Sequence, residues 1–189
     1  MWNLPNILTL LRIVLIPVFV VIFYLPWEWK HIVAASIFGI AAATDWLDGY
    51  LARKFDQHTS FGAFLDPVAD KLIISAALLV LVQVHATLLF ALPALVIVSR
   101  EIVISALREW MAEIGKRTSV AVNYLGKVKT ALQMIAITVL LATDSIKHPE
   151  WDILGTILLY ISAALTLWTM VIYLRAAWPE LSLVPDSQD

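Results

Sequence analysis

The chain has 189 residues, of which 61% are hydrophobic and only 15% are charged, and its formal net charge is −2. A composition this apolar excludes an ordinary soluble domain and predicts an integral membrane protein. The absence of cysteine excludes disulfide bonds and thiolate metal sites. We therefore expect membrane lipid around the chain, and no nucleic acid among its partners.

Six apolar segments are candidates to cross a bilayer, which takes roughly 20 mostly apolar residues. They cover residues 6–25, 31–53, 62–84, 87–111, 125–142 and 153–174. The sequence thus predicts an all-α integral membrane protein with six transmembrane helices. We expect residues 1–178 to form a single membrane domain, followed by a short polar tail at residues 179–189.

Basic residues are concentrated in two of the five predicted connections. The second and fourth connections are flanked by Arg53, Lys54, Lys116, Arg117, Lys127 and Lys129. The first and fifth hold one lysine each, and the third holds neither lysine nor arginine. Because positively charged connections stay in the cytoplasm, we expect both termini to be cytoplasmic. We expect the protein to lie in the cytoplasmic (inner) membrane, because the sequence shows no targeting segment and forms one small domain. Charged clusters gather in the same half, which favours a polar cavity open to the cytoplasm.

Four aspartates lie in and beside the second and third apolar segments at helical spacing. Asp45 and Asp48 are three residues apart, and Asp66 and Asp70 are four apart, so each pair shares one face of its helix. Two helices joined by a short loop would bring the four carboxylates together. Hard cations such as Mg²⁺ take carboxylate and phosphate oxygens as ligands, so four acids could hold two ions.

Paired metal ions suit displacement at phosphorus, because they stabilise both the attacking and the leaving oxygen. Gly49 allows a substrate to approach the backbone closely, and Arg53 is placed to offset phosphate charge. Carboxylates within a membrane also mark ion paths, so a cation or proton transporter is the alternative of a different class. The lack of an internal repeat and the one-sided placement of charge count against a transporter.

The motif Asp45-x2-Asp48-Gly49-x2-Ala52-Arg53-x8-Gly62-x3-Asp66-x3-Asp70 resembles the signature of the CDP-alcohol phosphatidyltransferase family at every position. The resemblance implies a site for two Mg²⁺ or Mn²⁺ ions. Their ligands would be Asp45, Asp48, Asp66 and Asp70, with Asp70 also the general base. The CDP-lipid would be bound by Thr44, Gly49, Ala52, Arg53, Thr59 and Gly62. A homodimer is implied as well.

Four further stretches resemble the branch of this family whose acceptor is glycerol 3-phosphate. They are residues 6–12, 66–71, 99–102 and 126–130. This resemblance implies transfer of a phosphatidyl group from CDP-diacylglycerol to sn-glycerol 3-phosphate, giving phosphatidylglycerophosphate and CMP. The same chemistry with another acceptor, such as inositol phosphate, is the alternative within the family.

A dianionic acceptor needs a cationic pocket of its own. Arg100 and Arg108 are eight residues apart and share a helical face, while Lys127 and Lys129 open the fifth predicted helix. We predict that these four residues bind the acceptor phosphate. Neighbouring glutamates offer the arginines a purely structural pairing, and the lysines could simply anchor the helix at the headgroups.

Three polar residues fall on roughly one face of the first predicted helix. Asn6, Thr9 and Arg12 are spaced three residues apart, and Arg175 ends the sixth predicted helix. We treat all four as candidates for substrate binding. For the first three, capping and anchoring of the helix is the alternative interpretation.

Overall fold

The structure, a computed structural model, describes residues 4–55, 60–115 and 124–181. Within these ranges the side chains of residues 4–5, 45–55, 60–61, 63, 124–125, 127 and 179–181 are not described. The described residues form helices and no strand, as α1 (Leu4–Tyr24), α2 (Lys30–Phe55), α3 (Ser60–His85), α4 (Leu88–Glu113), α5 (Tyr124–Ala142) and α6 (Pro149–Leu181). The predicted all-α architecture with six helices is confirmed for this part of the chain.

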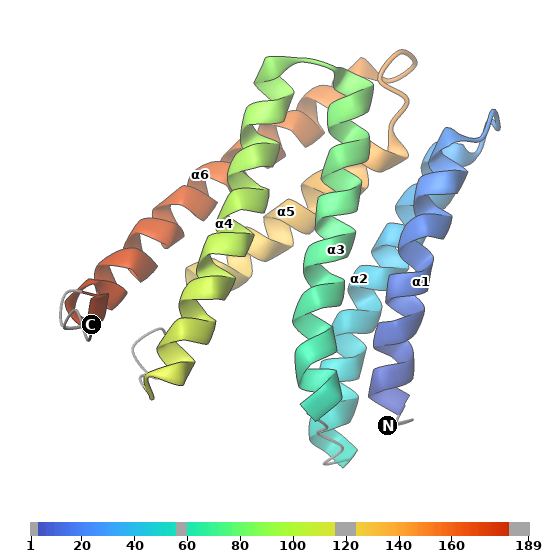
Figure 1. Cartoon of the computed structure of the whole chain (residues 1–189). Coiled ribbons are helices and arrows are strands. Elements are labelled where there is room, and N and C mark those ends of the chain that lie inside the picture. The colour runs from blue at the N-terminus through green and yellow to red at the C-terminus, as the bar shows by residue number, and fades with distance from the viewer. Residues whose placement is uncertain (1–3, 56–59, 116–123, 182–189) are drawn as a thin grey trace, which may run out of the picture.

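The helices run back and forth between two ends of the molecule (Figure 1). The connections from α1 to α2, α3 to α4 and α5 to α6 lie at one end, and the start of α1 and the end of α6 lie at the other. Helix α1 packs on α2 and α3, α5 packs on α2 and α6, and α4 packs on α3 and α6. The end of α2 and the start of α3, which carry the acid motif, therefore lie at the end that holds the start of α1 and the end of α6.

Within the described residues, four helices are long and apolar enough to cross a membrane, judged by length and composition. These spans are residues 6–24, 64–85, 88–113 and 149–178. Helices α2 and α5 contain shorter apolar stretches, residues 30–44 and 128–142. Each stretch ends next to residues whose side chains are not described, residues 45–55 of α2 and residue 127 of α5. Six complete spans therefore stay a prediction.

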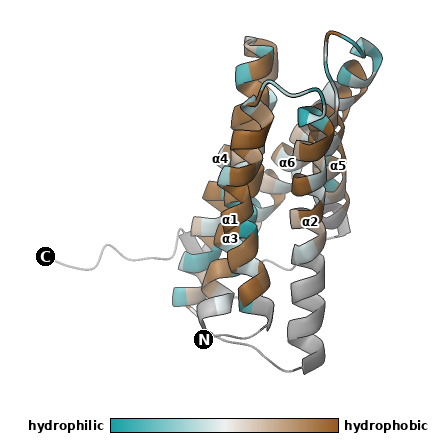
Figure 2. Cartoon of the chain, turned by 90° about the vertical axis from the view of Figure 1, so that its right-hand side faces the viewer, coloured by the Kyte–Doolittle hydropathy of each residue, from teal (hydrophilic) through white to brown (hydrophobic). Residues whose placement is uncertain are grey.

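The interior of the bundle combines large apolar side chains with alanines. Phe19, Phe38 and Ile73 are buried, and Ala41 and Ala136 are completely buried. Small residues allow helices to approach closely, which strengthens packing where no water is present to drive association. Apolar residues cover most of the length of the helices (Figure 2), and many large ones are exposed, a surface suited to lipid.

The connection between α3 and α4 consists of two residues. Ala86 adopts a positive φ of 47°, which reverses the chain. The hydroxyl of Thr87 then accepts a hydrogen bond from the backbone N–H of Phe90 at 3.3 Å and caps α4. Gly115, with φ 74°, follows the end of α4, in the conformation that commonly terminates a helix. Helix α4 thus returns the chain to the end that holds the acid motif.

Two glycines offer a test of the packing between α5 and α6. A Cβ added at Gly155 would lie 2.7 Å from Cγ of Leu140, whereas a Cβ at Gly39 would meet nothing within 4 Å. Gly39→Ala should raise the melting temperature in detergent slightly, because alanine favours a helix over glycine by roughly 0.5–1 kcal/mol. Gly155→Ala should lower it, because overpacking costs about 1–3 kcal/mol. Equal melting temperatures for the two variants would contradict the described contact.

Candidate active site

The second aspartate pair lies on α3, where both side chains are described. Asp66 and Asp70 are one helical turn apart and both are partly exposed, with 41% of the Asp70 side chain accessible. A half-exposed carboxylate pair on one helical face can accept a ligand from the polar end of the bundle. This is the arrangement that the spacing of the two residues predicts.

Helix α1 contacts both carboxylates of this pair. The hydroxyl of Thr9 donates to Oδ1 of Asp66 at 2.7 Å, and Nη1 of Arg12 donates to Oδ1 of Asp70 at 2.9 Å. The Arg12 side chain is completely buried. Each carboxylate is therefore held from the side by a group that itself has little freedom to move. This is how residues outside a metal's ligand set commonly fix the orientation of its ligands.

The polar face of α1 thus has a role beyond the two that the sequence left open. Asn6, Thr9 and Arg12 are all buried, at 3%, 0% and 1% exposure. Buried polar groups need hydrogen-bond partners, and Thr9 and Arg12 find theirs in the two carboxylates of α3. Their spacing indicated a common face, but it carried no signal that this face meets the acid pair. Substrate binding by these residues stays a prediction.

Most of the remaining motif residues fall where side chains are not described. Asp45, Asp48, Gly49, Ala52 and Arg53 lie on α2, whose backbone continues as a helix through all five. Thr59 lies outside the described residues altogether.

Two predicted CDP-lipid residues are described. Gly62 is buried near the start of α3. The Thr44 hydroxyl donates to the carbonyl of Ala41 at 2.8 Å, within its own helix. That bond occupies the hydroxyl's proton and leaves its lone pairs as the groups it can offer a ligand.

A cluster of charged side chains joins α4, α5 and α6. Arg100 and Lys129 are buried, at 7% and 3% exposure, and both donate to Oε1 of Glu101, at 2.8 and 2.6 Å. The guanidinium carbons of Arg100 and Arg108 lie 5.7 and 5.4 Å from the ring centroid of Tyr173. Three of the four predicted acceptor-binding residues therefore form one basic cluster, which we define as Arg100, Arg108 and Lys129.

Sequence reasoning missed two residues that hold the basic cluster together. Glu101 was visible only as a structural partner for an arginine, and its bond to Lys129 on α5 was not foreseen. Tyr173 gave no signal, because a tyrosine in an apolar helix is ordinary. Of the other predicted residues, Lys127 has no described side chain, and Arg175 is exposed on α6.

A polar contact connects the acid pair with the helix that carries the basic cluster. Lys71, next to Asp70 on α3, donates to the hydroxyl of Ser105 on α4. Ser105 lies between Arg100 and Arg108 along the chain. The contact therefore fixes the acid pair on α3 beside the stretch of α4 that supplies two cations. A reactant that reached both could contact carboxylates and cations together.

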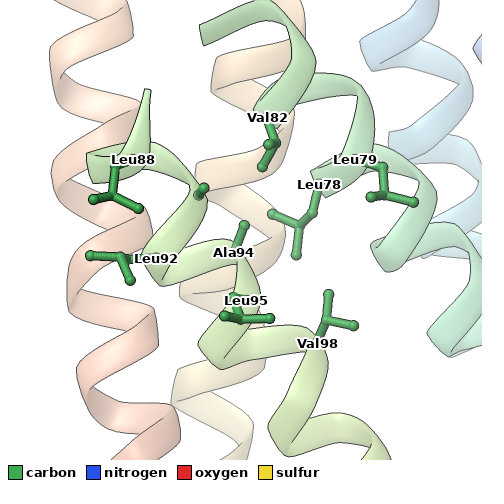
Figure 3. Close-up of a pocket in the computed structure, with 9 residues that line it drawn as sticks. Leu78, Leu79, Val82, Leu88, Leu92, Ala94, Leu95 and Val98 are labelled. Atoms are coloured by element: carbon green, nitrogen blue, oxygen red, sulfur yellow. The ribbon is translucent and has the colours of Figure 1, made fainter. Parts of the chain in front are cut away.

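An apolar cavity of about 320 Å³ lies between α3 and α4, away from these charges (Figure 3). It is lined by Leu78, Leu79, Val82, Leu88, Ala91, Leu92, Ala94, Leu95 and Val98. Its walls offer no group that could bind a charged nucleotide or a phosphate. We therefore place the candidate site at the polar contacts of α1, α3 and α4.

Comparison with known proteins decides the family. The family model for CDP-alcohol phosphatidyltransferase matches residues 2–168. The chain belongs to the CDP-alcohol phosphatidyltransferase family. Proteins named CDP-diacylglycerol–glycerol-3-phosphate 3-phosphatidyltransferase are similar over 95% of the chain. The Pseudomonas fluorescens protein is 55% identical over 92% of its own length, and the Salmonella paratyphi A protein is 52% identical over 97% of its length.

Members of the CDP-alcohol phosphatidyltransferase family generally use divalent metal ions. Among the described side chains no group of three or more possible ligands gathers. Two of the four predicted ligands, Asp66 and Asp70, are described, and they fit such an ion. Their carboxylates are hard oxygen donors on adjacent turns, and side chains from α1 fix both of them. The complete four-aspartate site stays a prediction.

The bond from Thr9 to Asp66 allows a test of this supporting role. Thr9→Val removes the hydroxyl and keeps the shape, and we expect it to raise the Mg²⁺ concentration for half-maximal activity by about tenfold or more, as loss of an outer contact typically does. Thr9→Ser keeps the hydroxyl and should behave like the unmodified protein. Binding of Mn²⁺, followed by electron paramagnetic resonance, should weaken by a similar factor. Unchanged metal binding in Thr9→Val would contradict the role.

Proposed function

We propose that this chain transfers the phosphatidyl group of CDP-diacylglycerol to sn-glycerol 3-phosphate, giving phosphatidylglycerophosphate and CMP. The relatives are named for this reaction, and their similarity to the chain extends over nearly the whole length of both proteins. The observation that carries the choice of acceptor is the basic cluster beside the acid pair. Glycerol 3-phosphate is a dianion, and an uncharged acceptor would have less use for the cations Arg100 and Lys129.

The reaction exchanges one oxygen substituent on phosphorus for another. The primary hydroxyl oxygen of glycerol 3-phosphate attacks the β-phosphorus of the CDP-lipid, and the bond from that phosphorus to the oxygen of CMP breaks. We assign Asp70 as the base that takes the hydroxyl proton. Metal ions bound by the four aspartates would stabilise charge on the attacking and leaving oxygens. Arg12 and Thr9 hold the carboxylates of α3 in place while this happens.

The placement of the substrates follows from the same assignment. We place the cytidine diphosphate part against Thr44, Gly49, Ala52, Arg53, Thr59 and Gly62. The acceptor phosphate lies on the basic cluster with Lys127. Asn6, Thr9, Arg12 and Arg175 are further candidates for substrate contact, and Thr9 and Arg12 would make it while they hold the carboxylates of α3.

The membrane setting is part of the proposal. Six spans with both termini in the cytoplasm would put the acid motif, the basic cluster and a polar cavity at the cytoplasmic face of the inner membrane. Glycerol 3-phosphate could then arrive from water while the lipid stays in the bilayer. We further propose a homodimer, for which the family resemblance is the only support.

Measuring CMP release with a series of acceptors tests the function directly. Purified protein in detergent with CDP-diacylglycerol and Mg²⁺ should release CMP with glycerol 3-phosphate, and not with inositol phosphate, inositol, serine or no acceptor. EDTA should stop release, and added Mg²⁺ or Mn²⁺ should restore it. Release with another acceptor alone would overturn the choice of acceptor. No release by folded protein with any acceptor would favour the transporter interpretation.

Asp70→Asn tests the assigned base. The asparagine oxygen can still accept the hydrogen bond from Arg12, but the buried guanidinium loses its charged partner, so we expect a folded protein with a lower melting temperature and a turnover below detection. Binding of CDP-diacylglycerol should be weakened far less than turnover. The fold can be checked by the melting temperature, with Asp56→Asn, in the same polar stretch, as the matched control. Substantial turnover in Asp70→Asn would remove its assignment as base.

Arg108→Ala tests the basic cluster. Arg108 is exposed and contacts the ring of Tyr173, so its loss should leave the fold intact. We expect the KM for glycerol 3-phosphate to rise about tenfold or more, because a charge-assisted hydrogen bond contributes about 1.5–3 kcal/mol. The KM for CDP-diacylglycerol should change little. An equal rise in both KM values would indicate a structural role instead.

A further inference from the structure

Glu101 lies at the centre of the basic cluster, although it carries the wrong charge to bind phosphate. Its Oε1 accepts hydrogen bonds from Nη1 of Arg100 at 2.8 Å and from Nζ of Lys129 at 2.6 Å. The glutamate is three-quarters buried, and the lysine is almost completely buried. A single carboxylate oxygen thus joins a cation of α4 to a cation of α5.

The charges of this network match the charge of the proposed acceptor. Arg100, Arg108 and Lys129 carry three positive charges and Glu101 carries one negative charge, so these described groups sum to +2. A phosphate monoester carries about −1.5 to −2 at neutral pH. The cluster can therefore neutralise the acceptor phosphate without leaving excess charge in a membrane protein, where unpaired charge is expensive.

Glu101 also opposes the repulsion between the cations. Two like charges 4 Å apart repel by about 4 kcal/mol at an effective dielectric constant of 20. Without the carboxylate, Arg100 and Lys129 would move apart or lose their fixed orientation before a ligand arrives. With it, both cations are already placed, and binding does not have to order two long side chains.

The network continues on the other side of Arg100. Its guanidinium and that of Arg108 lie over the ring of Tyr173, which is buried on α6. Arg100 is therefore held by a carboxylate from α4 and an aromatic ring from α6, and Lys129 is held by the same carboxylate. Glu101 is the group that both buried cations share.

We propose that Glu101 is a positioning residue for the acceptor: it sets the spacing of Arg100 and Lys129 so that they receive the phosphate of glycerol 3-phosphate, without touching the substrate itself. This inference rests on the proposed function. There are two competing interpretations. In one, Glu101 only joins α4 to α5; in the other, it competes with phosphate for the two cations. The three interpretations predict different kinetics.

Glu101→Gln in the full-length protein separates them. If Glu101 positions the cations, the KM for glycerol 3-phosphate should rise about tenfold or more, the size typical for loss of a supporting contact. The kcat at saturating acceptor and the KM for CDP-diacylglycerol should change much less. Inorganic phosphate, used as a competitive inhibitor, should lose affinity by a similar factor. The exposed Glu109→Gln, on the same helix, is the matched control and should leave all values unchanged.

Two results would overturn the inference. A lower melting temperature with both KM values unchanged would leave Glu101 as a helix contact only. A lower KM for glycerol 3-phosphate would make Glu101 a competitor of the phosphate. If Glu101→Gln does not fold, Glu101→Asp keeps the charge but shortens the reach, and the same rise in acceptor KM is expected.

The KM of the unmodified protein for glycerol 3-phosphate must be measured first, because it distinguishes a failure of the proposed function from a failure of the role of Glu101. If the unmodified protein does not use glycerol 3-phosphate, the proposed function fails and the inference fails with it. If it does use this acceptor and Glu101→Gln binds it equally well, the inference alone fails.

Discussion

The ion pair between Arg12 and Asp70 is the constraint on which the arrangement of the site depends. A guanidinium with no exposed surface must have a charged partner, because a buried charge without one is strongly destabilising. The carboxylate of Asp70 supplies it, which fixes α1 against α3 at the level of the acid pair. Thr9, one turn earlier, then reaches Asp66. The same contacts that satisfy α1 also orient the groups proposed to do the chemistry.

Buried charges on α4 and α5 are also paired, but there one carboxylate serves two cations. Buried cations on α4 and α5 share Glu101, and the contact from Lys71 to Ser105 ties α4 to α3 beside Asp70. Each cluster therefore pairs opposite charges, Arg12 with Asp70 in one and Glu101 with Arg100 and Lys129 in the other. A reaction between a nucleotide-linked lipid and a phosphorylated acceptor needs both kinds of cluster within reach of one phosphorus atom.

Much of the fold could be predicted from the sequence, because apolar length and the position of charge are local properties. The six helices agree with prediction, and α6 differs most, starting at Pro149 and ending at Leu181 where residues 153–174 were expected. Its polar first turn was assigned to a connection, although proline is well suited to the first helical position.

The site could be predicted only in part. The spacing of Asp66 and Asp70 fixes their common face, and the spacing of Arg100 and Arg108 does the same. Contacts between helices are not local, so no pattern indicated that Thr9 meets Asp66 or that Lys129 meets Glu101. The role of Tyr173 depends entirely on which helix α6 packs against.

The central claim is that the acid pair and the basic cluster serve one reaction centre. The most direct test is the ³¹P relaxation of glycerol 3-phosphate bound to the protein loaded with Mn²⁺, since a paramagnetic ion relaxes only nuclei close to it. We predict strong relaxation that disappears when Asp66 and Asp70 are both changed to asparagine, while glycerol 3-phosphate still binds. Bound glycerol 3-phosphate whose phosphorus is unaffected by Mn²⁺ would contradict the account, because the acceptor pocket would then lie away from the metal.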